Sequence, residues 1–197
     1  GDITEFELEK IRRDIKITCI YEGTSESQQS NISPFRWKET RKSKGEYYQS
    51  ISREMEAMDS GINDVGCRLY GLAAGVLNDT IMLAHDNRLT RKQHVMFLLA
   101  DMMTHVEVGA SFARKAVTHS KDGNPEAEKI KAMSRIFADE VAQLVSQNAI
   151  KILMGSGVFD QEAAHEFMET HSYNQLVCSG LNVINDMDLI ADLLFAR

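Results

Sequence analysis

The sequence predicts an all-α protein built as an antiparallel helix bundle. Only 2 of the 197 residues are proline and 10 are methionine, and Ala, Leu and Glu are frequent. This composition favours helix and leaves long stretches free of helix breakers. Apolar residues recur at three- and four-residue steps and hardly ever alternate with polar ones, which is the pattern of amphipathic helices and not of strands. The length is sufficient for one sizeable hydrophobic core.

Capping and helix-breaking residues predict where the helices begin and end. Thr24 or Ser25 can cap a short helix, and Pro34 should stop it because the residue before a proline avoids the helical region. Asn124-Pro125 is typical of a helix start, and Gly155 of a helix end. The expected helices are residues 4–20, 25–32, 46–87 with a possible kink at 59–61, 90–120, 125–154, 160–171 and 173–195.

Residues 34–45 read as a basic linker between two structural units. Five bases stand here against a single acid, Glu39. The bases are Arg36, Lys38, Arg41, Lys42 and Lys44. A solvated linker is one interpretation. The alternatives are peripheral contact with an anionic membrane surface or with the phosphate groups of a ligand, since Lys and Arg serve both.

The composition of the chain indicates which kinds of binding partner and cellular compartment to expect. A net charge of −7 argues against general nucleic-acid binding. The 3 cysteines are far apart and show neither a disulfide framework nor zinc spacing, which suits a cytoplasmic or other reducing interior. No run of about 18 apolar residues is present, so no membrane span is predicted. Because the chain starts with Gly, we expect it to be a piece of a longer protein, whose N-terminal targeting segment would not be visible here.

The stretch from Tyr21 to Glu26 is the strongest candidate for chemistry. Glu22 stands directly before Gly23 and Thr24, at the end of an apolar run. A glycine lets the backbone approach a ligand closely, and a carboxylate beside it can act as a base. By spacing alone, however, such a stretch is also common at an ordinary helix end.

The longer string around this motif is more specific. Residues 13–28, with Tyr21-Glu22-Gly23-Thr24 at their centre, resemble the acyl-CoA dehydrogenase family. The resemblance implies that Glu22 is the catalytic base, which removes a proton next to the thioester carbonyl while a hydride leaves for the flavin of FAD. It further implies that Gly23 lies near the acyl thioester and that Thr24 and Glu26 lie near the flavin. Ser27 departs from the family, which usually has an apolar residue there.

The resemblance returns in the second half of the chain. Residues 96–116, 135–142 and 150–157 are similar, in order and spacing, to the C-terminal helical bundle of the same family. The whole layout resembles very-long-chain acyl-CoA dehydrogenases, which have an extra helical domain after the catalytic core. The offset that aligns the two halves pairs Glu22 with Ser179, which has no carboxylate, and Met154 replaces a family glycine. We therefore expect the second bundle to have the fold without the active site.

These observations lead to one main expectation and one alternative. Residues 1–33 would be the end of a catalytic bundle, 34–45 the linker, and 46–197 a second, degenerate bundle. The chain would be the C-terminal part of an FAD-dependent acyl-CoA dehydrogenase that acts on acyl-CoA, forms a homo-oligomer and passes electrons to an electron-transfer flavoprotein. By itself it should be inactive and hold no FAD. The alternative is a non-catalytic helical module for dimerisation or membrane docking of a flavoprotein.

At the other candidate sites, a structural role is favoured over a functional one. Glu162-x-x-His165 is half of a di-iron bundle motif, but no second copy accompanies it, so no metal site is predicted. Asp101 and His105 lie one helical turn apart and are expected to form a structural pair. The methionines fall mostly at core-spaced positions and are expected to serve packing. Ser179-Gly180 lacks the context of a nucleophile and is expected to be a turn.

Overall fold

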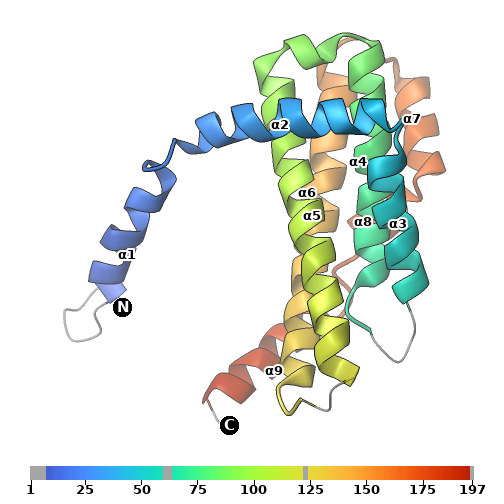
Figure 1. Ribbon diagram of the computed structural model, residues 1–197. Coiled ribbons are helices and arrows are strands. Elements are labelled where there is room, and N and C mark those ends of the chain that lie inside the picture. The colour runs from blue at the N-terminus through green and yellow to red at the C-terminus, as the bar shows by residue number, and fades with distance from the viewer. Residues whose placement is uncertain (1–7, 60–63, 122–123, 196–197) are drawn as a thin grey trace.

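The computed structural model describes residues 8–59, 64–121 and 124–195, and within these residues it contains helices and turns but no strand. The all-α prediction is therefore confirmed (Figure 1). The helices are α1 (Leu8–Lys16), η2 (Ile17–Cys19), α2 (Ser25–Lys42), α3 (Glu46–Met58), α4 (Cys67–Asp86), η3 (Leu89–Arg91), α5 (Gln93–Lys121), α6 (Ala127–Gly155), α7 (Gln161–Thr170), α8 (Tyr173–Val177) and α9 (Val183–Phe195).

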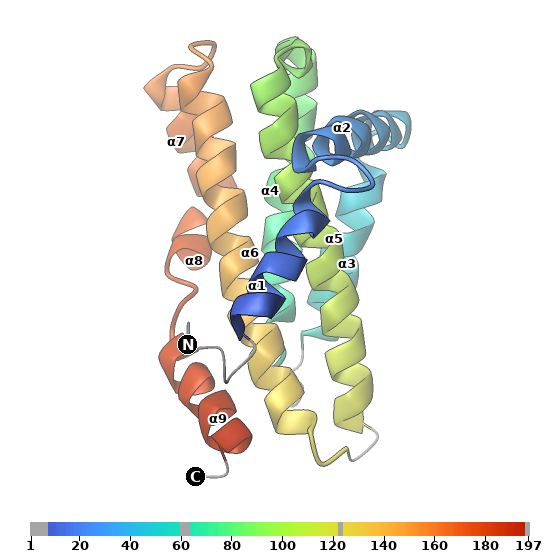
Figure 2. The same ribbon diagram turned by 90° about the vertical axis from the view of Figure 1, so that its left-hand side faces the viewer.

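The helices α4, α5 and α6 form the centre of the bundle. Helix α3 packs along α4, while α7 and α8 pack on α6 (Figure 2). Helix α2 crosses one end of the bundle on α5, and α9 packs on α6 near the other end. Helix α1 stands apart from the bundle (Figure 1), and its main contact among the described elements is with η2, which follows it directly.

The core is apolar and continuous from α3 to α8. Its largest fully buried side chains come from every central helix; they include Tyr48, Met55, Tyr70, Leu77, Ile81, Leu99, Met102, Met103, Leu153 and Leu176. Buried hydroxyls find backbone acceptors: Tyr70 donates to the carbonyl of Ser134 at 2.8 Å, and Tyr173 to that of Ser146 at 2.7 Å. This pairing removes the cost of burying a polar group in an apolar core.

Helix α2 shows that the expected stop at Pro34 is wrong. The helix runs through the proline to Lys42, so most of the predicted 34–45 linker is helix. Pro34 gives up one backbone hydrogen bond, but Ser33 and Thr40 are fully buried in the contact between α2 and the bundle. Tertiary packing therefore overrides the local preference of the residue before proline.

The expected helix 46–87 is in fact two helices. Helices α3 and α4 pack against each other, with Asp59 ending the first and Gly66 in the left-handed conformation before the second. The kink expected at 59–61 lies mainly outside the described residues. A long apolar periodicity fits two paired helices as well as one, which is why the pattern did not reveal the turn.

The remaining boundaries agree better with the sequence. Asp160 caps α7 as expected, accepting a hydrogen bond from the Ala163 amide at 2.9 Å. Gly155 is the last residue of α6. The expected helix 173–195, however, is split into α8 and α9, with Asn182 at φ 71° between them, and Thr90 lies in η3 and does not cap α5.

Helix α5 belongs to the core even though its composition is strongly apolar. Residues Gln93–Ser120 would be long and apolar enough to cross a membrane, but half of its most apolar stretch is buried inside the bundle. That is the behaviour of a central helix in a helical bundle. Met55, Met96, Met102 and Met103 are buried, and Met58 and Met168 pack against the core. Met133, Met154 and Met187 are exposed, so the prediction that the methionines mostly serve packing is confirmed with these three exceptions.

Candidate functional site

The Tyr21–Glu26 stretch forms a tight turn between η2 and α2. Glu22 and Gly23 both have positive φ, at 59° and 105°, and Thr24 caps α2 by accepting a hydrogen bond from the Ser27 amide at 3.3 Å. The Gln28 side-chain amide donates to the Glu22 carbonyl at 2.6 Å. The backbone of this turn is thus fixed by its own residues, and the Glu22 side chain projects from it.

The predicted site residues are adjacent, but in this chain they are not enclosed. Glu22, Gly23, Thr24 and Glu26 are all exposed, and Ile20 and Tyr21, which could form an apolar wall, are 58% and 53% exposed. Within the described residues, the Glu22 carboxylate makes no hydrogen bond or ion pair. A carboxylate base needs a dry surrounding to match its pKa to neutral pH, and this part of the chain supplies none.

The loop that the sequence analysis pairs with the Glu22 turn lies between α8 and α9. Ser179 lies in this loop beside a cleft of about 490 Å³ that Asp64, Arg135 and Asp186 also line. The Ser179 hydroxyl donates to the Asp139 carboxylate, which also accepts from the Gln143 amide at 2.8 Å. Asp139 is 7% exposed. The hydroxyl thus helps to satisfy a buried carboxylate and ties the loop to α6.

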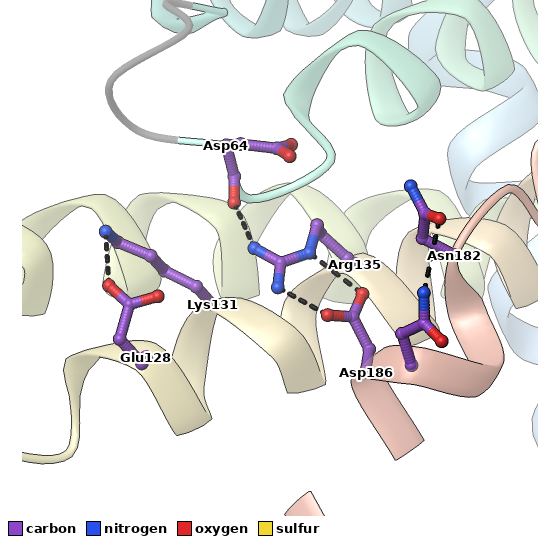
Figure 3. Close-up of polar contacts among 7 residues, drawn as sticks. Asp64, Glu128, Lys131, Arg135, Asn182 and Asp186 are labelled. Carbon is purple, nitrogen blue, oxygen red and sulfur yellow. Dashed lines mark hydrogen bonds and ion pairs between the residues drawn. The ribbon is translucent and has the colours of Figure 1, made fainter. Parts of the chain in front are cut away.

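Arg135 of α6 also lines this cleft. Figure 3 shows its contacts with the neighbouring segments. Arg135 donates to both carboxylate oxygens of Asp186 on α9, at 2.9 Å from Nε to Oδ2, and to the backbone carbonyl of Asp64 at 2.8 Å. The hydrogen bonds that Arg135 donates to Asp186 raise the pKa of the Arg135 guanidinium above its usual value. Through these three hydrogen bonds, Arg135 holds α9 and the Asp64 segment together.

Some residues of the basic stretch 36–44 make contacts within the protein. Arg36 pairs with Glu107 of α5 at 2.7 Å, and Tyr48 donates to the same carboxylate at 2.9 Å. Burial raises the pKa of Tyr48 far above its ordinary value. Trp37 packs against the ring of His85, with centroids 5.6 Å apart. The exposed bases that remain are Lys38, Arg41, Lys42 and Lys44.

The weaker candidates show no catalytic arrangement. Asp101 accepts from the Gln29 amide at 2.6 Å, and His105 bonds the Asp101 backbone carbonyl at 2.7 Å, so the two side chains do not pair with each other. Glu162 and His165 are exposed. Across the described ranges no group of His, Cys, Asp and Glu is arranged to hold a metal ion.

Comparison with known proteins gives the family. A model of the acyl-CoA dehydrogenase C-terminal domain matches residues 52–178, more than half of the chain. The chain belongs to the acyl-CoA dehydrogenase family. The match covers α4 to α8 and most of α3, which is the bundle that the sequence predicted to be family-like, and it does not include the Tyr21–Glu26 turn.

Individual relatives agree with this family. The chain is similar to a probable acyl-CoA dehydrogenase of Mycobacterium leprae, with 25% identity over 67% of this chain and 35% of the relative. It is also similar to a cyclohex-1-ene-1-carbonyl-CoA dehydrogenase of Geobacter metallireducens, with 29% identity over 68% of this chain and 37% of the relative. A subunit of a caffeyl-CoA reductase-Etf complex of Acetobacterium woodii is 27% identical over 57% of this chain and 31% of that subunit.

The chain spans about a third of the length of these curated relatives. No solved structure matches it. Sequence reasoning found the family and the turn, but it missed the Arg135–Asp186 and Arg36–Glu107 ion pairs. Their partners are separated by 51 and 71 residues, and no local spacing predicts a contact over such a distance.

Proposed function

We propose that the protein containing this chain is an FAD-dependent acyl-CoA dehydrogenase, and that Glu22 is the base that removes the α-proton of the acyl thioester. The observation that carries the proposal is the Tyr21-Glu22-Gly23-Thr24 turn in a chain of this family. Two consecutive residues with positive φ hold the carboxylate out from the backbone, and Gly23 leaves room for a thioester to approach.

We propose that the described residues of this chain do not form a flavin site on their own. Thr24 uses its hydroxyl to cap α2, Glu26 is exposed, and the clefts found in the described residues are lined by other segments. FAD, when bound, would supply the hydride acceptor. Only the proton step is assigned to this chain, and the 197-residue chain alone is proposed to be inactive.

Replacing the carboxylate by an amide tests the base. In the whole protein, Glu22→Gln should abolish dehydrogenation and the exchange of the substrate α-proton with D₂O, while acyl-CoA binding is retained, because the amide keeps the shape but cannot accept a proton. Asp14→Asn, an exposed acid of α1 outside the turn, is the matched control. Proton exchange at the native rate in Glu22→Gln would refute the assignment.

The partners and compartment are proposed on the same basis. We propose an electron-transfer flavoprotein as electron acceptor, by analogy with the Acetobacterium relative, which is a subunit of a reductase-Etf complex, and a reducing interior, which suits three free cysteines. Reduction of such a flavoprotein by the whole enzyme, with acyl-CoA as donor, tests the first of these.

A second candidate function is a non-catalytic module for dimerisation or membrane docking. It is favoured by the exposure of all four turn residues and by the exposed bases Lys38, Arg41, Lys42 and Lys44. Binding of the chain to anionic vesicles at low salt, lost in Lys38→Glu/Lys42→Glu, would support membrane docking. No binding at low salt would exclude it.

A further inference from the structure

A side chain of α2 closes the turn that carries Glu22. The Gln28 side-chain amide donates a hydrogen bond to the backbone carbonyl of Glu22 at 2.6 Å. Glu22 lies before the N-cap of α2, whereas Gln28 lies in the first turn of that helix, so the bond spans six positions of the chain. It links the backbone of the proposed base directly to α2.

This hydrogen bond restricts the direction in which the Glu22 side chain leaves the backbone. Glu22 has a φ of 59°, a left-handed conformation that costs free energy in any residue with a Cβ and that persists only where surrounding contacts favour it. A bond to the Glu22 carbonyl limits rotation about the Cα–C bond, one of the two soft dihedrals of the residue. This rotation decides where the Cβ, and with it the carboxylate, lies relative to α2.

The glycine after Glu22 makes room for the Gln28 amide. Gly23 has a φ of 105°, and an added Cβ at this position would lie 3.1 Å from Nε2 of Gln28. The amide therefore lies against the Cα of Gly23 and would have to shift to admit a side chain there. Gly23 thus allows Gln28 to reach the Glu22 carbonyl, in addition to leaving room for a ligand.

Helix α2 gives Gln28 a fixed place relative to the bundle. The helix runs from the turn to the bundle without a break and packs on α5 (Figure 1). The next residue, Gln29, donates to the Asp101 carboxylate of α5 at 2.6 Å, and Ser33, one turn further on, is fully buried. A flexible linker at residues 34–45 would have separated the turn from the bundle, whereas the continuous helix carries the turn at its N-terminal end.

The hydroxyl groups of the turn contact the start of α2 and not Glu22. The Thr24 hydroxyl accepts from the Ser27 amide at 3.3 Å and lies 3.2 Å from the Ser27 hydroxyl. These contacts order the first turn of the helix. Of the side-chain hydrogen bonds in the described part of the chain, the one from Gln28 is the one that reaches Glu22.

We propose that Gln28 is a positioning residue of the dehydrogenation, whose amide holds the Glu22 backbone in the conformation that aims the carboxylate at the α-proton of the acyl thioester. The inference rests on the proposed role of Glu22 as the base. Gln28 contacts the backbone of Glu22 and not its carboxylate, so it acts on the geometry of proton removal. Loss of the hydrogen bond therefore slows proton removal, because a base that is out of place reacts slowly, and leaves acyl-CoA binding intact.

Two variants of the whole protein test the proposal. Gln28→Met keeps the length of the side chain but has no N–H to donate, and Gln28→Glu keeps its shape and replaces the donor by an acceptor. Asn31→Asp, the same change from amide to carboxylate at an exposed position one turn further along α2, is the matched control. The measurements are kcat and α-proton exchange with D₂O per bound flavin, the Kd for acyl-CoA, and hydrogen exchange of the backbone amides of residues 22–25.

Both Gln28 variants should lower kcat and the α-proton exchange rate roughly 10- to 100-fold, with the Kd for acyl-CoA unchanged. The pH dependence of the rate in Gln28→Met should keep its position, because the lost bond does not involve the carboxylate. The amides of residues 22–25 should exchange faster in both variants, and Asn31→Asp should behave as the wild type in every measurement.

Three results would each overturn the role of Gln28 while Glu22→Gln remains inactive. They are a native rate per bound flavin in Gln28→Met, a rise in the Kd for acyl-CoA with kcat unchanged, and a lowered rate without faster hydrogen exchange in the turn. The first would leave Gln28 a structural residue, the second would make it a substrate contact, and the third would mean that it acts by another route. If Glu22→Gln itself keeps the native rate, the base assignment fails, and the role of Gln28 fails with it.

Discussion

Where two helices of this bundle approach closely, a single residue determines whether a side chain fits between them. At Gly109 of α5, an added Cβ would lie 2.4 Å from the Tyr70 ring, and that ring is fully buried with its hydroxyl bonded to the Ser134 carbonyl. The ring cannot move without breaking this hydrogen bond. The contact between α4 and α5 therefore depends on the absence of a side chain at residue 109.

Gly109→Ala is expected to destabilise the protein by about 1–2 kcal/mol, because overpacking outweighs the gain in helix propensity. Urea unfolding followed by circular dichroism measures the change. Gly155→Ala is the matched control, since nothing lies within 4 Å of its added Cβ. Equal stability of the two variants would mean that the α4–α5 contact relaxes freely.

A second residue pair links stability to pH. The Asp79 carboxylate of α4 accepts from Asn78 at 2.8 Å and lies 3.1 Å from Nε2 of His171, next to α7. The hydrogen bond with His171 is the main cause that lowers the pKa of Asp79 below its usual value. A lowered pKa means that the folded state favours the carboxylate, so this stabilisation is full above the unfolded pKa of about 3.9 and is lost as the pH falls through the folded value.

Accordingly, the stability difference between the wild type and Asp79→Asn should be constant above about pH 5 and shrink below about pH 4. Urea unfolding at a series of pH values measures it. In a His171→Gln background the same substitution should give a smaller and flatter difference. If the pH dependence is unchanged in that background, His171 is not its cause.

At the scale of elements, an ion pair reinforces the packing of α9 on α6. Arg135 of α6 spans Asp186 of α9 and the Asp64 carbonyl, and the exposed side of α9 offers little other packing. Asp186→Ala leaves a half-buried guanidinium without its partner, which is expected to cost about 1–3 kcal/mol. Asp188→Ala, an exposed change on the same helix, should cost less than about 0.5 kcal/mol.

Unfolding in urea measures the loss, and hydrogen exchange locates it. In Asp186→Ala, the amides of α9 should exchange faster. The exchange rates of the α4 and α5 amides should change only as far as the free energy of global unfolding changes. Uniform change across all helices would show that the ion pair stabilises the whole bundle and does not specifically dock α9.

Elements were predicted well where the signal was local and poorly where packing decided. Asp160 and Gly155 act through their own backbone neighbourhood, and both mark helix ends as expected. Pro34 does not end α2, because burial of Ser33 and Thr40 against the bundle outweighs a local preference. The α3–α4 turn escaped detection since paired helices repeat the same apolar period.

The candidate site was predictable only as a turn. Tyr21–Glu26 could be recognised from its residues, and the structure shows its strained backbone at Glu22 and Gly23. The turn is exposed in the described chain, and a short motif does not encode the enclosure that a base needs. The same holds for the Ser179 loop, whose bond to Asp139 joins residues 40 positions apart.

At the scale of the molecule, stability is unevenly distributed. Helices α4, α5 and α6 share a buried core, whereas the described side chains of α1 are exposed throughout. Local opening free energies range from near zero for such unpacked elements to the global value in the core.

Hydrogen exchange of the 197-residue chain tests this uneven distribution directly. The amides of α1 should exchange at nearly the unprotected rate, because its described side chains are exposed, while those of α4 to α6 should exchange only through global unfolding. Protection of α1 equal to that of α4 to α6 would show that the helix is held by the rest of its own chain and opens only together with the core.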